Sequence, residues 1–279
     1  MSYRERSALI DKSHPEINLS RQAELLDISR SSIYYQPIAD QVKIKILNAI
    51  DEIYTACPFY GSRKIKEQLD REYEIFICRD YVRSLMKTLG LQAIYPRKKL
   101  NLSPPNKFHK KYPYLLKDLE IRYPDHVWST DITYVRLKYG FAYLTVILDL
   151  FSRYVLSWKL SETLESDFCV QTLEKALEIN VPDFHNSDQG TQFTSENYLS
   201  VLERDEIQIS MDGRGRCLDN IFTERLWRTV KYENVYLLDY QNIAEAEQGL
   251  SEYFQFYNHR RIHQSLDYKT PAEIYFSKN

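Results

Sequence analysis

The second half of the chain begins with apolar runs in which buried-type and polar side chains alternate. These runs cover residues 127–137, 141–150 and 153–160, with the turn-forming pairs Tyr139-Gly140 and Phe151-Ser152 between them. Alternation with a period of two is typical of strands that bury one face. The pattern predicts three consecutive antiparallel strands joined by tight turns.

Helical and strand-like segments alternate after these three strands. Helices are expected at about 166–180 and 195–204, short strands near 185–188 and 207–210, and a long final helix from about 219. The order βββαβαβα predicts an α/β fold with a mixed sheet, in which parallel strands extend an antiparallel meander and helices cover the sheet.

The front of the chain has the pattern of short helices. Residues 14–37 indicate a helix, a turn and a second helix, with Ser20 as the expected N-cap and Leu25 facing inward. A polar second helix is typical of a helix-turn-helix that binds DNA, and a helical hairpin that only packs is the alternative. The candidate DNA contacts on this second helix are Arg30, Ser31, Ser32 and Tyr34.

A second helical group follows, with helices expected at about 39–55, from Arg63 and near Arg79. Most basic side chains on such helices are solvated surface, but their excess also suits contact with phosphates. Arg63 and Lys64 are the candidate DNA contacts in this group.

Residues 97–111 mark the clearest boundary in the sequence. They contain six basic residues, no acidic residue and a Pro-Pro pair, which is typical of an extended linker that could follow a nucleic-acid groove. Arg97, Lys98 and Lys99 are its candidate DNA contacts. We predict a helix-turn-helix-like region at 1–56, a second helical DNA-binding region at 57–96, a basic linker at 97–120, and a catalytic core with its tail at 121–279.

Charge is distributed unevenly along the chain. Residues 1–111 contain 20 Lys and Arg against 13 Asp and Glu, whereas residues 112–279 contain 17 against 26. A basic first half and an acidic second half indicate a polyanion that is held by the first and processed by the second. Ordinary charge scatter is the alternative.

Several other classes of protein are disfavoured. The apolar run 141–151 is too short to span a bilayer, and the N-terminal segment lacks the apolar core of a signal peptide, so we expect a soluble intracellular protein with no membrane partner. The four cysteines lie far apart, which argues against a disulfide framework or a cysteine-rich zinc site. His259 and His263 have ligand-like spacing but lack an acidic or thiol partner within a few residues.

Three acidic residues fall in three different predicted elements. Asp131 lies in the middle of the first strand, Asp188 ends a short strand, and Glu224 lies in the last helix. A carboxylate in mid-strand is costly unless it is paired or bound to a metal, and hard oxygen ligands can hold divalent ions against a phosphodiester. Glu224, Arg228 and Lys231 share one helix face, which could offer a metal ligand and phosphate contacts together; a surface salt bridge is the alternative.

Asp149 is a rival acidic residue. It ends the second strand, and we expect it to pair with Arg153 across the following turn. That pair would give Asp149 a structural role.

With these residues in view, the sequence resembles the DDE transposases of bacterial insertion sequences, of the retroviral integrase superfamily, and in particular their downstream-frame (OrfB-type) protein. The likeness covers nearly the whole chain. Its most specific segments are WSTDITYV, YLTVILDLFSRYVLSW, HNSDQGTQFTS, DNIFTERLWRTVKYE and YNHRRIHQSLDYKTPAEIY. The segments SRQAELLDISRSSIYYQP and YGSRKIKEQL match the helical DNA-binding region expected ahead of such a core.

The resemblance implies a fold, a site and a reaction. The fold would be RNase H-like, and Asp131, Asp188 and Glu224 would form the catalytic, metal-binding triad. The cofactor would be Mg²⁺, as two ions, with Mn²⁺ able to substitute. Water would first attack a phosphodiester at the element's end, and the freed 3′-OH would then attack another phosphodiester. Lys231 would contact the DNA of the transposon end.

The resemblance also implies partners. These are the terminal inverted repeats of an insertion sequence and target DNA, a homo-oligomer formed on that DNA, and an upstream-frame protein as a fusion partner. The expected location is the bacterial cytoplasm, at the nucleoid. Two other interpretations stay open: a DNA-binding regulator derived from a transposase, and an RNA–DNA hybrid nuclease of the same fold, which would not need the basic helical front half.

Overall fold

The computed structural model describes residues 3–34, 40–94, 112–212 and 221–277. Among these residues, no helix is both long and apolar enough to cross a membrane. The predicted DNA contacts Arg97, Lys98 and Lys99 lie outside the described residues.

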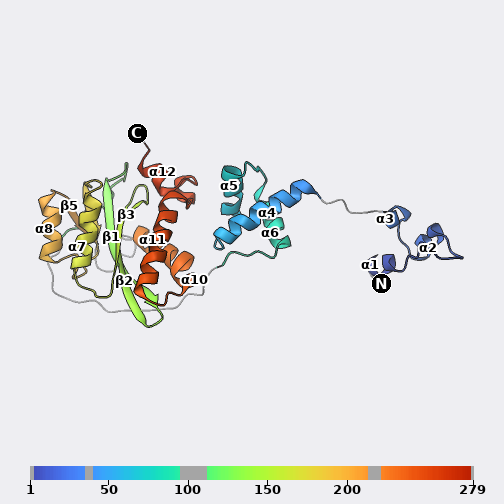
Figure 1. Cartoon of the computed structure of the whole chain (residues 1–279). Coiled ribbons are helices and arrows are strands. Elements are labelled where there is room, and N and C mark those ends of the chain that lie inside the picture. Colours follow the sequence, from blue (N-terminus) through green and yellow to red (C-terminus); the bar gives the residue numbers. More distant parts are fainter. Residues whose placement is uncertain (1–2, 35–39, 95–111, 213–220, 278–279) are drawn as a thin grey trace.

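A single mixed sheet of five strands organises the second half of the chain (Figure 1). Its strands are β1 (Val127–Leu137), β2 (Gly140–Asp149), β3 (Val155–Ser161), β4 (Phe184–Ser187) and β5 (Gln208–Met211). They lie in the order β3-β2-β1-β4-β5, with β1 to β3 antiparallel and β4 and β5 parallel to β1. The predicted meander and its parallel extension are therefore confirmed.

The alternation of side chains along β1 divides the core of this domain into two layers. The helices that cover the sheet are α7 (Asp167–Leu177), α8 (Glu196–Arg204), α9 (Ile221–Val230) and α11 (Ile243–His259). Trp128 belongs to the cluster that packs under α7 and α8. Val127 and Val135 point the other way, into the cluster formed with α9 and α11. Asp131 lies an even number of positions from both Val127 and Val135 on the same strand, so its side chain is on the face that α9 covers.

Helix α9 changes its winding without a break. It continues into a π-helical segment (Lys231–Val235) and then a short α10 (Tyr236–Leu238). π-Helical turns are rare and occur frequently at functional sites.

The end of the chain folds back over α11. A 3₁₀ turn (Gln264–Leu266) leads into α12 (Pro271–Tyr275). The N-cap Thr270 and Glu273 form a capping box, in which each side chain accepts a hydrogen bond from the other's backbone N–H. The proline at the first helical position suits this helix start.

Three helices ahead of the sheet form a separate core. They are α4 (Gln41–Ala56), α5 (Ser62–Glu72) and α6 (Arg79–Thr88). Their buried residues, including Ile50, Ile65 and Leu69, make one hydrophobic cluster. This cluster spans the boundary that the sequence predicted between residues 56 and 57. The Phe59 ring meets the Phe256 ring of α11 edge-on at 6.2 Å, which joins the cluster to the sheet domain.

The first three helices form a smaller unit, made of α1 (Tyr3–Ala8), α2 (Leu19–Leu25) and α3 (Arg30–Tyr34). The N-cap of α2 is Asn18, whose side chain accepts a hydrogen bond from the Arg21 N–H at 3.0 Å, so the prediction of Ser20 was wrong. Leu25, predicted to face inward, is 60% exposed. The buried polar residue is Gln22, which bonds the backbone of Asp11.

Candidate active site

Asp131 lies in mid-strand, where β1 passes under α9. Its side chain accepts two hydrogen bonds of 2.8 Å, from the backbone N–H of Ile132 and from the indole N–H of Trp227. Trp227 is buried on α9, so this bond fixes the helix against the strand at the position of the carboxylate. Sequence analysis did not identify Trp227, although it stands three positions, or about one helical turn, after Glu224.

Asp188 is the second predicted acid, and the sheet register brings it beside Asp131. Ser129 of β1 pairs with Asn186 of β4. Two residues further along these parallel strands come Asp131 and Asp188, and neighbouring strands lie about 4.8 Å apart. The Asp188 Oδ1 atom accepts a hydrogen bond of 2.8 Å from the N–H of Gly190, which holds the carboxylate at the end of the strand.

The two carboxylates resist ionisation. Burial and, next to it, the charge of Asp188 raise the pKa of Asp131 to about 7, although the hydrogen bonds from Trp227 and Ile132 act in the opposite direction. The pKa of Asp188 is also raised, because protein atoms crowd its carboxylate although the residue is solvent-accessible. Two acids that destabilise each other's charge favour the binding of a cation.

We expect the contribution of Asp131 to the stability of the metal-free protein to fall as the pH rises from about 4 to 7. An unfolded Asp has a pKa of about 3.9, so in this interval native Asp131 holds a proton that the unfolded chain has lost, and the free energy of unfolding decreases with pH. One such group contributes a slope of up to about 1.4 kcal/mol per pH unit.

Urea unfolding in EDTA over this pH range, with Asp131→Asn beside the parent protein, measures the effect. The variant should show a shallower decline. Equal slopes in the two proteins would mean that Asp131 does not titrate as described.

Asp212 is a third acid at this site, and it was not among the residues that the sequence singled out. Ser187 of β4 pairs with Met211 of β5, so Asp212 comes level with Asp188 on the next strand. Its Oδ1 atom accepts a hydrogen bond of 2.8 Å from the Asn186 amide, and its charge adds to the raised pKa of Asp131. The available signal was its position just beyond a predicted strand, much as Asp188 ends the strand before it.

Glu224 lies on α9, one turn before Trp227, and is exposed. In the parts of the chain that the structure describes, no group of three or more His, Cys, Asp or Glu side chains is arranged to hold a metal. The structure therefore brings Asp131 and Asp188 together and leaves Glu224 at the helix surface nearby. Burial lowers the pKa of Lys231, and the charge of Asp131 partly offsets this effect. Lys231 is therefore also close to Asp131.

Asp149, the rival acid, is fully buried and has a local structural role. Its carboxylate accepts hydrogen bonds from the backbone N–H of Asp125 and from the N–H and hydroxyl of Ser152. The expected pair with Arg153 was wrong: the guanidinium lies 3.6 Å from the centre of the Phe222 ring instead.

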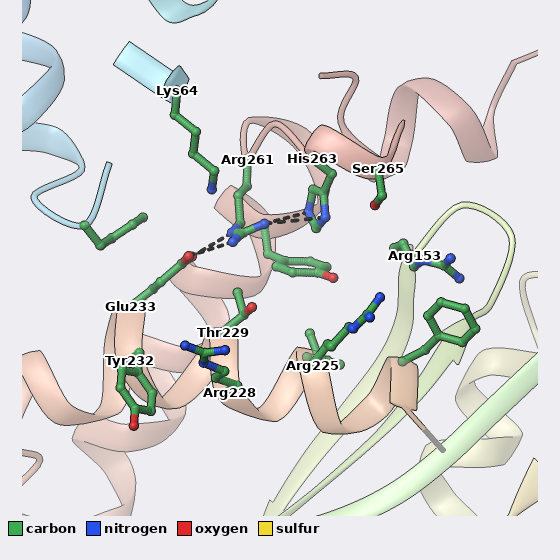
Figure 2. Close-up of a pocket in the computed structure, with 14 residues that line it drawn as sticks. Lys64, Arg153, Arg225, Arg228, Thr229, Tyr232, Glu233, Arg261, His263 and Ser265 are labelled. Atoms are coloured by element: carbon green, nitrogen blue, oxygen red, sulfur yellow. Dashed lines mark hydrogen bonds and ion pairs between the residues drawn. The ribbon is translucent and has the colours of Figure 1, made fainter. Parts of the chain in front are cut away.

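The remaining candidate DNA contacts fall into two groups. On α3, the exposed residues are Arg30, Ser31 and Tyr34, while Ser32 is half-buried. On α5, Arg63 is exposed but Lys64 points inward, into a pocket that Arg228 of α9 also lines (Figure 2).

The tail residues contribute to closing the fold. The Asn258 side chain exchanges hydrogen bonds with the backbone of Val155 on β3, at 3.0 and 2.9 Å. Arg261 is buried and bonds both carboxylate oxygens of Glu233 at 2.6 Å. His263 contacts Arg261, and burial holds the pKa of this histidine well below its usual range.

The fold and the carboxylate pair define a polynucleotidyl transferase of the integrase-core type. Residues 122–217 and 205–271 match the integrase core domain, and residues 42–99 match an HTH-like domain. A solved assembly, the simian T-cell lymphotropic virus intasome in complex with PP2A regulatory subunit B56 gamma, has the same fold, with a TM-score of 0.50 and 18% identity over 83% of this chain and 75% of that one.

Proteins of insertion sequences align over most of the chain. The InsK protein of insertion sequence element IS150 from Escherichia coli (strain K12) is 33% identical over 268 residues, or 93% of each chain. The transposase for insertion sequence element IS629 from Shigella sonnei is 30% identical over 236 residues, which cover 84% of this chain and 78% of that protein. The chain belongs to the insertion-sequence transposases, as the sequence motifs predicted.

Proposed function

We propose that Asp131, Asp188 and Glu224 hold divalent metal and that the protein uses this site to cut the ends of an insertion sequence and join them to target DNA. The observation that carries the proposal is the placement of Asp131 and Asp188 side by side on adjacent strands, with the pKa of both raised. Carboxylate oxygens are the donors that Mg²⁺ prefers, so the pair fits such an ion.

Glu224 would complete the ligand set from α9. The Trp227–Asp131 hydrogen bond fixes this helix against β1, and the exposed Glu224 side chain has room to turn toward the strand. A bound divalent ion would neutralise the carboxylates and polarise the scissile phosphodiester as a Lewis acid. We propose Mg²⁺ as that ion, two ions at the working site, and Mn²⁺ as a substitute.

The chain's own residues would place the DNA. Lys231, close to Asp131, and Arg228, one turn after Glu224, lie where they can hold phosphates on either side of the scissile bond. Hydrolysis breaks the P–O3′ bond and leaves a 3′-OH on the element. This hydroxyl then forms a new P–O bond in the target and releases a target 3′-OH.

Terminal repeats and target DNA are the proposed partners, with the HTH-like domain supporting the first contact. We propose a homo-oligomer on DNA, because an element has two ends that must be joined to one target, and an upstream-frame protein as a further partner. The nucleoid is the proposed place of action.

Incubation of the protein with labelled element-end DNA and Mg²⁺ tests the function. Cleaved and joined products are the expected result. Binding without any cleavage would support a regulator that occupies element ends, and selective cutting of an RNA–DNA hybrid would support a nuclease of the same fold.

We further expect DNA affinity to depend mainly on residues 1–111, which carry the positive excess. Each phosphate contact on duplex DNA contributes about −0.9 to the slope of log K against log salt, so six to eight contacts would give roughly −5 to −7 for the whole chain. The fragment 112–279 should bind far more weakly and with a flatter slope in a fluorescence-anisotropy titration.

Circular dichroism would establish that the fragment is folded. If the folded fragment binds as tightly as the whole chain, the sheet domain provides most of the DNA affinity instead.

A further inference from the structure

A strongly basic pocket of about 450 Å³ lies where α5, α9, the turn before β3 and the segment after α11 meet (Figure 2). Its lining, all within the described residues, contains five Lys and Arg side chains and one acid, Glu233. Glu233 is already neutralised by two hydrogen bonds from Arg261. The remaining positive charges belong to Lys64, Arg153, Arg225 and Arg228.

Two of these four cations lie against aromatic rings, and in the described part of the chain none of the four is neutralised by an ion pair. The Arg153 guanidinium lies 3.6 Å from the centre of the Phe222 ring, and the Lys64 ammonium lies 4.6 Å from the centre of the Tyr60 ring. Within the described ranges, none of the four forms an ion pair. The Nη1 atom of Arg153 is buried and has no hydrogen-bond partner, which costs free energy until an acceptor arrives.

The backbone places Arg153 at the pocket in an unusual conformation. Its φ is +66°, in the left-handed region that residues other than glycine rarely adopt. Asp149 holds this turn through its hydrogen bond from the Ser152 N–H at 2.7 Å. Strained backbone of this kind persists only where the surroundings impose it, and it gathers at functional sites.

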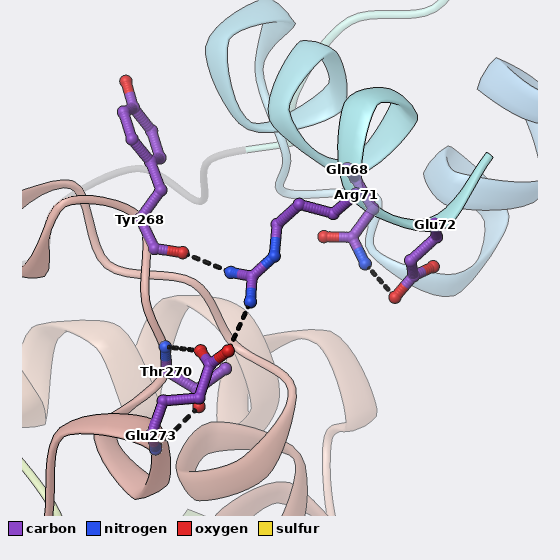
Figure 3. A network of polar contacts seen from close by, with 6 residues as sticks. All are labelled: Gln68, Arg71, Glu72, Tyr268, Thr270 and Glu273. Carbon is purple, nitrogen blue, oxygen red and sulfur yellow. Dashed lines mark hydrogen bonds and ion pairs between the residues drawn. The ribbon is translucent and has the colours of Figure 1, made fainter. Parts of the chain in front are cut away.

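The wall that carries Lys64 is fixed to the rest of the pocket. On the same helix, Arg71 pairs with Glu273 at 2.6 Å and donates a hydrogen bond to the carbonyl of Tyr268 (Figure 3). This contact and the Phe59–Phe256 ring contact hold α5 against the tail and α11. Lys64 is therefore directed toward α9.

The electrostatics of the pocket favour an anion. Burial and, next to it, the charge of Arg261 lower the pKa of Lys64 to about 8. Burial likewise lowers the pKa of Arg153 to about 10. A bound anion would offset the cost of keeping these groups charged.

We propose that this pocket holds a phosphate of an unpaired DNA strand that leaves the active site across α9. The inference rests on the proposed function. Arg225 directly follows Glu224, and Arg228 lies one turn further, whereas Trp227 faces Asp131 from the other side of the helix. A strand cut at the carboxylates would thus cross Glu224 and place its next phosphates among these cations.

The shape and lining of the pocket favour a single strand. A pocket of about 450 Å³ is too small to admit a stiff duplex, whereas an unpaired strand can bend into it. Sites for single-stranded DNA combine cations that follow the backbone with aromatic side chains for the bases. Here Tyr232, whose ring has the Arg228 guanidinium 5.8 Å from its centre, supplies the aromatic part.

Binding of full-length protein to fluorescent element-end duplexes tests the proposal. One duplex is blunt and the other carries a short single-stranded extension, both in EDTA so that no strand is cut. The double variant Lys64→Gln/Arg225→Gln should lose about tenfold in affinity for the extended duplex, with a salt slope flatter by about 1.4, or about 0.7 for each lost phosphate contact on a single strand. Binding of the blunt duplex should change by less than about twofold.

Matched controls separate the pocket from general loss of charge. Lys175→Gln and Arg204→Gln remove exposed cations from α7 and α8, on the opposite face of the sheet, and should not distinguish the two duplexes. Arg225→Gln alone, an exposed site, should keep the thermal unfolding midpoint and show part of the effect, and Arg225→Lys should restore most of it.

Three results would overturn the proposal. An equal loss of affinity for both duplexes would mean that the cations contact paired DNA. Unchanged affinity for the extended duplex would mean that the pocket does not bind DNA. Competition by free deoxynucleoside monophosphate or inorganic phosphate as strong as that by the strand would assign the pocket to small anions. Parent protein that binds neither duplex would instead count against the proposed function itself.

Discussion

Asp188→Asn is expected to abolish strand cleavage and joining while leaving DNA affinity nearly unchanged. The substitution keeps the size of the side chain and its ability to accept the Gly190 hydrogen bond, but removes the negative charge next to Asp131. Loss of one charge-stabilising group in an active site commonly costs about 10²–10³ in rate. We expect a loss of at least that size, measured as labelled product formed in Mg²⁺.

The matched control for this substitution is Asp183→Asn. Asp183 is exposed immediately before β4, at the opposite end of that strand, and its carboxylate accepts a hydrogen bond from the Tyr123 hydroxyl. Cleavage by this variant should stay within about twofold of the parent rate. Metal-dependent joining by a clean Asp188→Asn preparation would remove Asp188 from the site.

Arg261→Met is expected to lower the free energy of unfolding by about 3–5 kcal/mol, the usual cost of removing one member of a buried ion pair. The two side chains of the Arg261–Glu233 pair are each 10% exposed. Burial alone would raise the pKa of Glu233, but the charge and hydrogen bonds of Arg261 hold it below its ordinary value. Methionine would leave this carboxylate buried beside Tyr253 without its ion-pair partner.

Urea unfolding at neutral pH measures the loss, and two variants calibrate it. Arg204→Gln breaks the exposed Arg204–Asp205 pair and should cost less than about 1 kcal/mol. The double variant Arg261→Met/Glu233→Met should be more stable than Arg261→Met alone, because no unpaired charge stays buried. If Arg261→Met and Arg204→Gln cost the same, the buried pair contributes no more than a surface pair.

The lowered pKa of Glu233 also determines how its contribution to the free energy of unfolding changes with pH. Its contribution to stability is present above the unfolded pKa of about 4.3 and is lost as the pH falls through the lower native pKa. This trend is opposite to that of Asp131, whose raised pKa weakens the native state as the pH rises. Removing Glu233 should therefore make the slope of the free energy of unfolding against pH more negative. Removing Asp131 should make that slope more positive.

Local patterns were sufficient to predict the sheet. β1 begins and ends at the predicted residues, Val127 and Leu137, because alternation with a period of two is written in adjacent positions. The predicted N-cap of α2 was wrong because Asn and Ser are both favourable N-caps, so local preference alone does not choose between Asn18 and Ser20. Strand ends marked by a clear alternation were therefore predictable, whereas the choice between two good capping residues was not.

Features that depend on distant contacts were not predictable in the same way. Asp212 comes level with Asp188 only through the pairing of β4 with β5, which no local pattern specifies. Lys64 is next to the buried Ile65 in sequence, yet it points into a pocket because α5 packs near α11 and α9. The sequence singled out Asp131 and Asp188 as candidates, but not the register that places them on adjacent strands or the packing that forms the pocket.

The π-helical segment Lys231–Val235 has a consequence for how this chain tolerates length changes. A π-helical turn accommodates one residue more than an α-helical turn, so deleting a residue there can yield a regular α-helix with little local strain. The residues downstream would then keep nearly the same direction relative to Glu224, because the π turn had already absorbed the extra residue. A deletion within the regular α-helical part, Ile221–Val230, has no such turn to absorb it and would rotate everything downstream by about 100° relative to Glu224 or its upstream neighbours. Glu233 would then leave Arg261. The π-helical segment is thus the place in this helix where the chain can lose one residue and keep its tail in position.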